Sequence, residues 1–174
     1  MDKAALQALQ APLKERYRDD PDAARITLSA EGRLGDENVS CSVATGRAIV
    51  EAGLHPATGG TGLLACSGDM LLEALVACAG VTLRAVATSL EISVGGGRLR
   101  AEGDLDFRGT LGVAKDAPVG FSAIRLAIDV DTDATDDELA TLLKLTERYC
   151  VVYQTLAGSP SLDVTLSSAA GSVP

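Results

Sequence analysis

The spacing of hydrophobic residues changes along the chain and predicts a succession of different elements. Residues 2–18 have the period of an amphipathic helix, with leucines on one face and Pro12 as a candidate kink. From residue 25 the period becomes short and alternating, in segments separated by Gly and Asp: RITLSAEG, NVSCSVAT and RAIVEAG. This alternation is typical of an antiparallel meander. We therefore expect a peripheral helix within residues 1–20, followed by three strands.

The longest apolar run predicts a central helix. It spans residues 69–87, DMLLEALVACAGVTLRAVA, and extends to about Leu90. Ser67 is the predicted N-cap, and Asp69 in the first turn suits the positive end of the helix dipole. Apolar residues surround most of the circumference, so we expect this helix to be buried between other elements. They are Leu71, Leu72, Leu75, Val76, Val81, Leu83 and Val86.

Strand signals and then helix signals return after the central helix. Three strand-like segments come first: EISVGG, GRLRAEGDLDFRG and FSAIRLAIDVDT. The segment TDDELATLLKLTERYC then takes a helical period, and Thr135 with Glu138 forms a capping-box pattern. A last strand is predicted in SLDVTLSSA. This order predicts an α+β fold in a single domain over residues 1–174.

Composition and charge narrow the classes of function. A net charge of −9 disfavours binding to a phosphate backbone or an anionic membrane surface. Aromatic residues make up 3% of the chain and tryptophan is absent, which leaves no platform for stacking bases. Residues 1–20 lack an apolar core of signal-peptide type, and Asp69, Glu73 and Arg84 interrupt the central run. We therefore expect a soluble cytoplasmic protein that binds neither nucleic acid nor membrane.

The two internal helices each carry one cysteine, Cys78 and Cys150. A thiol in an apolar helix packs as a small core residue, and burial alone raises its pKa and leaves it inert. A reactive Cys78 needs a cation or a donor beside it, but the nearest helical cation, Arg84, is six positions away on another face. Any activating group must therefore come from a distant strand or from another subunit.

The motifs DMLLEALVACAG and LTERYCVVYQTL resemble the two cysteine motifs of the OsmC/Ohr superfamily, the osmotically inducible protein C and organic hydroperoxide resistance proteins. The order of elements from about residue 24 to 168 is similar to that family as well. This resemblance implies an OsmC-like fold with two antiparallel-rich sheets around two long central helices. It also implies an intertwined homodimer and a dithiol peroxidase that prefers organic hydroperoxides and needs no cofactor.

By position, the resemblance makes Cys78 the peroxidatic nucleophile and Cys150 the resolving thiol. The thiolate attacks the O–O bond, becomes a sulfenic acid and condenses with the second thiol, and a cellular dithiol reduces the disulfide. A small hydrophobic peroxide and a dithiol reductant are thus the implied partners. Apolar neighbours on the central helix are the predicted substrate pocket: Leu71, Leu75, Val81 and Val86.

The family's activating arginine comes from the N-terminal meander, and Arg47 is the candidate here, with Arg25 and Arg33 as alternatives. Asp69 stands at the place of the family's acidic partner, which is commonly glutamate. Val151 replaces the proline that usually follows the second cysteine. These departures indicate a divergent branch of the family. The alternative function is a small-molecule-binding or scaffold protein in which both cysteines are only buried.

The two other cysteines and the single histidine are not predicted to be functional. Cys41 lies in an alternating segment and Cys66 precedes the central helix, so both are interpreted as structural, although a thiol near a helix N-terminus gains from the dipole. His55 is the only histidine, and a zinc site would require remote cysteines to converge on it. No metal site is predicted.

Overall fold

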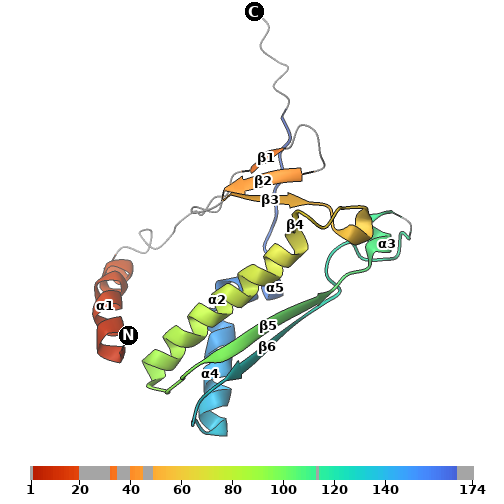
Figure 1. Cartoon of the computed structure of the whole chain (residues 1–174). Helices are drawn as coiled ribbons and strands as arrows, with labels where there is room; N and C mark the ends of the chain where they lie inside the picture. The colour runs from red at the N-terminus through yellow and green to blue at the C-terminus, as the bar shows by residue number, and fades with distance from the viewer. Residues whose placement is uncertain (1, 20–31, 35–39, 45–48, 113, 168–174) are drawn as a thin grey trace, which may run out of the picture.

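The computed structural model describes residues 2–19, 32–34, 40–44, 49–112 and 114–167, with the backbone alone at 9, 12–18, 32–34 and 40–44. The chain has an α+β architecture, as predicted, in which one long helix, α2 (Ser67–Leu90), runs through the middle of the molecule (Figure 1). The predicted N-terminal helix is confirmed as α1 (Lys3–Asp19). The Lys3 ammonium pairs with the Glu91 carboxylate at 2.8 Å, which places α1 beside the C-terminal end of α2.

The first sheet lies at the N-terminal end of α2 (Figure 1). Its strands are ordered β1 (Gly32–Leu34), β2 (Ser40–Ala44), β3 (Ile49–Gly53) and β4 (Ala65–Cys66). The first three pair antiparallel, which confirms the predicted meander, although residues 25–31 of its first segment lie outside the described part. The parallel pairing of β3 with β4 was not predicted, because a two-residue strand has no periodicity to detect. Between them the chain makes a short 3-10 turn, η2 (Pro56–Thr58).

The entry into α2 differs from the prediction. Cys66 is the N-cap, with extended backbone angles of φ −85° and ψ 127°, and Ser67 is already the first helical residue. The N-cap prediction for Ser67 was therefore wrong, because β4 continues to Cys66 and passes directly into the helix. Asp69 does lie in the first turn, and the helix ends at Leu90 as expected.

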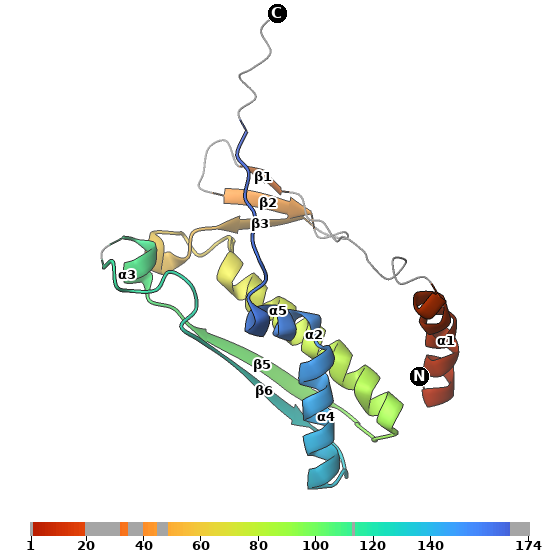
Figure 2. The same cartoon turned by 180° about the vertical axis from the view of Figure 1, so that it is seen from behind.

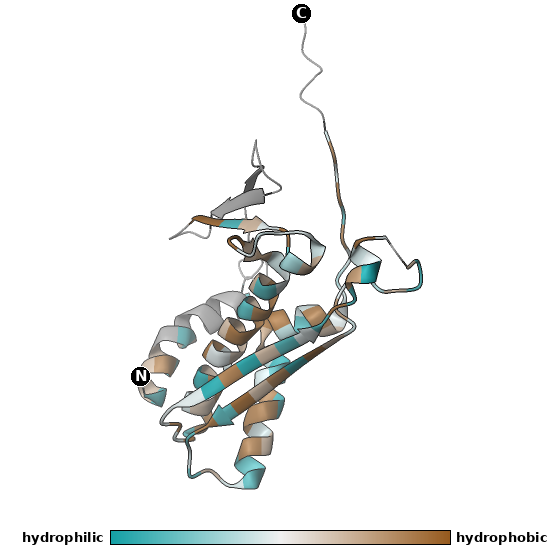
Figure 3. Ribbon diagram, turned by 45° about the vertical axis from the view of Figure 1, so that its right-hand side comes forward, coloured by the Kyte–Doolittle hydropathy of each residue, from teal (hydrophilic) through white to brown (hydrophobic). Residues whose placement is uncertain are grey.

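The second sheet is a two-stranded antiparallel hairpin, β5 (Gly97–Asp104) and β6 (Ala123–Val130), with the short helix α3 (Phe107–Thr110) in its connection. Figure 3 shows hydrophobic and hydrophilic residues alternating along both strands. The predicted strand EISVGG is wrong, since residues 92–96 have no regular structure beyond backbone bonds of Gly95 and Gly96 with Asp131. Ile92 and Val94 still pack against the core, but the glycines that follow them provide no side chains to bury.

The C-terminal part contains two consecutive helices. The first, α4 (Asp136–Tyr149), begins with the predicted capping box of Thr135 and Glu138. The second, α5 (Val151–Gly158), was not predicted. The last predicted strand is absent from residues 159–167, and the rest of it lies outside the described part. Its alternating pattern is present, but the described residues offer it no strand to pair with.

The core forms where α2 meets β5, α4 and α5 (Figure 2). It consists of two buried clusters along one face of α2, the first containing Leu83 and Val86 and the second containing Leu75 and Cys150. The prediction that α2 is buried all round was wrong, because Leu71 and Val81 on its other face are 38% and 74% exposed. The first sheet packs at the end of α2 instead of across this face.

The helix α2 is long and apolar enough by composition to cross a membrane, with a mean hydropathy of 1.8 over its most apolar window. Its buried face nevertheless packs against the hairpin and the C-terminal helices within this chain. That arrangement is typical of the core helix of a globular domain.

Candidate active site

The thiol of Cys78 lies halfway along α2, on the face that packs against the C-terminal helices. It is half-buried and belongs to the cluster that contains Leu75, Ala79 and Cys150. The strand β5 passes close to this part of α2, since an added Cβ at Gly80 would be in van der Waals contact with the Leu99 side chain at 3.7 Å. The core thus surrounds the thiol without covering it.

Cys150 is the residue at which α4 ends and α5 begins. Its backbone is extended, with φ −73° and ψ 108°, so the helix stops there and restarts in a new direction. Its N–H donates to the carbonyl of Thr146 at 2.9 Å, and its own carbonyl accepts from the N–H of Gln154 at 2.9 Å. The first N–H groups of α5 have no partner within the helix, which makes them available to another acceptor.

These free N–H groups meet the sulfur of Cys78. Burial raises the pKa of the Cys78 thiol, but the amide N–H of Val152, the Cys150 thiol, the amide N–H of Val151 and the Thr82 hydroxyl together lower it below its ordinary value. A thiolate at the N-terminus of a helix is stabilised by such donors and by the helix dipole. The start of α5 is thus an activating group for Cys78 within the same chain.

The pKa of Cys150 moves in the opposite direction. Burial raises the pKa of Cys150, because its side chain is only 1% exposed. Cys78 raises it further, because the Cys150 thiol must keep its proton to donate a hydrogen bond to the Cys78 sulfur. The amide N–H of Tyr153 acts against this rise without cancelling it. The two thiols are free and adjacent, and their pKa values are shifted in opposite directions.

The predicted arginine cannot be placed beside this site. Arg47 and its alternative Arg25 lie outside the described residues, and Arg33 is described by its backbone only. Arg84 donates to the backbone carbonyls of Val94 and Gly95 near the other end of α2. Among the described side chains, no guanidinium contributes to the lowered pKa of Cys78.

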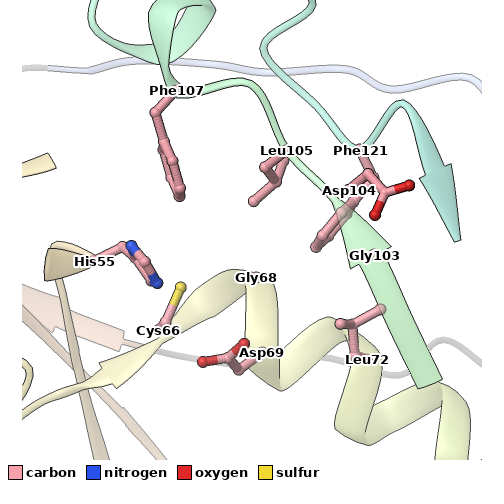
Figure 4. A pocket seen from close by; sticks show the side chains of 10 residues that line it. All are labelled: His55, Cys66, Gly68, Asp69, Leu72, Gly103, Asp104, Leu105, Phe107 and Phe121. Atoms are coloured by element: carbon pink, nitrogen blue, oxygen red, sulfur yellow. The ribbon is translucent and has the colours of Figure 1, made fainter. Parts of the chain in front are cut away.

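Asp69 stands apart from Cys78 within one chain. It lies nine residues earlier on α2, which corresponds to roughly 13 Å along the helix axis. It lines a cavity beside Cys66 and His55 instead (Figure 4). The role predicted for Asp69, as partner of an activating arginine, therefore remains a prediction.

The four residues predicted as a substrate pocket do not share one cavity. Leu75 and Val86 are buried in different clusters of the core, and Leu71 and Val81 are exposed on the other face of α2. The period of a helix predicts which residues are apolar, but only packing decides which of them face an empty space.

A cavity of about 220 Å³ lies directly against Cys150. Its walls come from α2, β6, α4 and the start of α5, and they are mostly apolar: Ala79, Leu126, Ile128, Leu143, Thr146, Glu147 and Tyr153. Sequence reasoning missed this cavity, because its walls come from four separate elements. The available signal was the apolar alternation of Leu126 and Ile128, which predicts an inward strand face and no more.

Metal binding has no support from the part of the chain that the structure describes. Within it, no three side chains of His, Cys, Asp or Glu lie close enough together to hold an ion.

The profile of the OsmC-like protein family matches residues 60–165, so the chain belongs to that family. No match was found among curated proteins. The fold is similar to the crystal structure of an OsmC-like protein from Mycoplasma pneumoniae, with a TM-score of 0.64 and 16% identity over 76% of this chain and 89% of that one.

Two solved organic hydroperoxide resistance proteins share the fold as well. The one from Legionella pneumophila has a TM-score of 0.60 and 19% identity, covering 78% of this chain and 92% of that one. The one from Elizabethkingia anophelis has a TM-score of 0.61 and 18% identity, covering 78% and 91%. At these identities the likeness extends to the fold alone. The comparisons thus show the family and the fold of the chain.

Proposed function

We propose that the protein is a thiol peroxidase that reduces organic hydroperoxides, with Cys78 as the attacking thiol and Cys150 as the resolving thiol. The observation that carries this proposal is the adjacency of two free thiols whose pKa values are shifted in opposite directions. The nucleophile must be a thiolate, and the second thiol must keep its proton until the first has been oxidised.

The reaction divides into two displacements. The Cys78 thiolate attacks the terminal oxygen of the O–O bond, an S–O bond forms, and the alcohol leaves after taking up a proton. Cys150 then loses its proton and attacks the sulfur of the sulfenic acid, which forms the S–S bond and releases water. A dithiol reductant returns both sulfurs to thiols by exchange, and we place it in the cytoplasm, where thiols are kept reduced.

The cavity against Cys150 supports an apolar substrate. Its volume of about 220 Å³ and its mostly apolar walls suit a short hydrocarbon group, and the Glu147 carboxylate disfavours an anionic one. A peroxide whose hydrocarbon part lies in this cavity would hold its oxygens next to Cys150, whose thiol neighbours the Cys78 sulfur. Organic hydroperoxides should therefore react faster than hydrogen peroxide.

Exposed apolar surface supports a homodimer. Val81 on α2 and the segment 159–167 are uncovered in the described chain, and the segment alternates apolar and polar residues as a strand does. Its apolar members, Leu162, Val164 and Leu166, are at least 88% exposed. Pairing with a second copy would bury them. Light scattering should then give twice the chain mass of 17.8 kDa.

The direct test is oxidation by one equivalent of cumene hydroperoxide, followed by peptide mapping. The expected product is a disulfide between Cys78 and Cys150, with Cys66 still free. Disulfide formation should be faster than with hydrogen peroxide at the same concentration. Two free thiols after this treatment would reject the peroxidase and favour the alternative, a small-molecule-binding or scaffold protein.

A further inference from the structure

A second cavity, of about 390 Å³, opens at the N-terminal end of α2 (Figure 4). Its lining comes from η2, from the junction of β4 with α2, and from the connection between β5 and β6. It contains a thiol, Cys66, which the proposed peroxidase reaction does not use. Cys66 precedes Cys78 by twelve residues, which corresponds to roughly 18 Å along α2. The cavity is therefore separate from the candidate active site.

The sulfur of Cys66 lies over the first turn of α2 and is open to the cavity. The thiol is free and half-buried, and it makes no capping hydrogen bond although Cys66 is the N-cap. Gly68 leaves the sulfur uncovered, since an added Cβ there would lie 3.6 Å from it and 3.5 Å from the Phe121 ring. This sulfur is therefore positioned to react with a molecule in the cavity.

His55 places a fixed hydrogen-bond donor opposite this thiol. Its Nδ1 accepts from the N–H of Ala57 at 3.1 Å, so the neutral ring carries its proton on Nε2. Its ring stacks on Phe107 with centroids 4.8 Å apart and an interplanar angle of 16°. Figure 4 shows the imidazole edge and the Cys66 sulfur pointing toward each other. The cavity thus combines a nucleophile with an N–H donor held by stacking.

The walls combine apolar side chains with polar ones and therefore suit an uncharged molecule. Phe107, Phe121 and Leu72 provide apolar surface, and Gly103 is what lets the Phe121 ring lie on β5, because an added Cβ would be 2.4 Å from it. Two carboxylates line the cavity: Asp69, and Asp104, which pairs with the Arg125 guanidinium at 2.7 Å. An anionic ligand would therefore meet the Asp69 carboxylate and a chain of net charge −9.

We propose that this cavity is a second reactive site, in which Cys66 forms a covalent adduct with a small uncharged α,β-unsaturated carbonyl compound. The Cys66 thiolate adds to the β-carbon, so that a C–S bond forms as the C=C π bond breaks. The electron pair moves to the carbonyl oxygen, which accepts a hydrogen bond from Nε2–H of His55. The α-carbon then takes a proton from water, which balances the proton that the thiol released. No oxidant or reductant is consumed, so this reaction is independent of peroxide reduction.

The experiment uses phenyl vinyl ketone and its 4-carboxyphenyl analogue as matched neutral and anionic probes. Adduct formation is followed at each cysteine by peptide mapping, and each rate is divided by the rate of N-acetylcysteine with the same probe at the same pH. For the neutral probe we expect the ratio at Cys66 to be roughly tenfold or more, because the cavity orients the reactants. The anionic probe should give a clearly lower ratio. A ratio of one or below for the neutral probe, or equal ratios for the two probes, would overturn the proposal.

Two variants distinguish a reaction assisted by His55 from one that occurs only because the Cys66 thiol is accessible. His55→Phe keeps the aromatic stack and removes the donor, so the rate with phenyl vinyl ketone should fall about tenfold. Methyl methanethiosulfonate, which needs no carbonyl activation, should label Cys66 equally fast in both proteins. An unchanged ketone rate in His55→Phe would refute the role of the donor. Cys66→Ser should abolish the adduct and leave the Cys78–Cys150 disulfide intact, so a failure of either proposal is recognised separately.

Discussion

Two thiols on the same helix lie in contrasting surroundings. Cys78 packs in the core against the start of another helix, whose N–H groups face its sulfur, whereas Cys66 lies at the start of its own helix and opens to a cavity. Burial by itself raises the pKa of the Cys78 thiol, but the donors around its sulfur lower this pKa by more. The contrast teaches that donors aimed at a sulfur outweigh the apolar character of its surroundings.

Replacing Cys78 by serine should have the largest effect. A serine hydroxyl is not ionised at neutral pH and does not attack peroxides as a thiolate does. We expect the consumption of cumene hydroperoxide to fall on the order of 10³-fold or more, since deleting a covalent nucleophile removes the whole pathway. Cys66→Ser is the matched control and should retain full activity. Equal losses of activity in the two variants would contradict the assignment of peroxide reduction to Cys78 alone.

Replacing Cys150 by serine should stop turnover after the first step. Without a resolving thiol, the Cys78 sulfenic acid accumulates and dimedone traps it as a mass adduct on the peptide that contains Cys78. Hydroperoxide consumption should then stop at about one equivalent per chain. Sustained consumption would show that another thiol resolves the intermediate.

Val151→Pro tests the amide donors at the start of α5. Proline is tolerated at the first helical position, Cys150 before it is already extended, and the Val151 side chain is 69% exposed, so the fold should remain. Loss of this N–H should raise the pKa of Cys78 and slow its oxidation at neutral pH by up to about tenfold. Val151→Ala keeps the N–H and is the control. If both variants react like the unmodified protein, the Val151 N–H does not activate Cys78 and another group must do so.

The pH dependence of alkylation should distinguish the two paired thiols. The pKa of Cys78 is lowered and that of Cys150 is raised, so Cys78 should reach half of its maximal rate with iodoacetamide at the lower pH. The sign for stability follows from the same shifts. Ionisation of Cys78 stabilises the fold above the unfolded thiol pKa, and this contribution is lost as the pH falls through the folded value. Identical profiles for both thiols would contradict the assignment.

Gly103→Ala should disturb the Cys66 cavity and spare Cys78. The added methyl group would collide with the Phe121 ring, and relief of this contact should lower the free energy of unfolding by about 1–3 kcal/mol. Urea denaturation measures that loss, and alkylation of Cys78 by iodoacetamide serves as the internal control. A change in the Cys78 rate as large as that at Cys66 would show that the two sites are coupled.

Much of the fold followed from local sequence signals. The extent of α2, the capping box at Thr135 and the alternation along β5 and β6 all depend on residues close in sequence. The failures occurred where the local signal was weak or misleading. The helix α5 follows α4 after a single extended residue, and the segment 159–167 carries a strand pattern but pairs with no described strand.

The same distinction between local signals and packing applies to the candidate site. The sequence by itself determined that Cys78 lies within an apolar helix and that Cys150 ends a second one, because both facts depend on hydrophobic periodicity and capping. Only the tertiary structure decided that the N–H groups of α5 face the Cys78 sulfur, and that His55 faces Cys66 across a cavity. Such contacts join residues far apart along the chain, and a side chain's neighbours across space are fixed by packing, which no local period encodes.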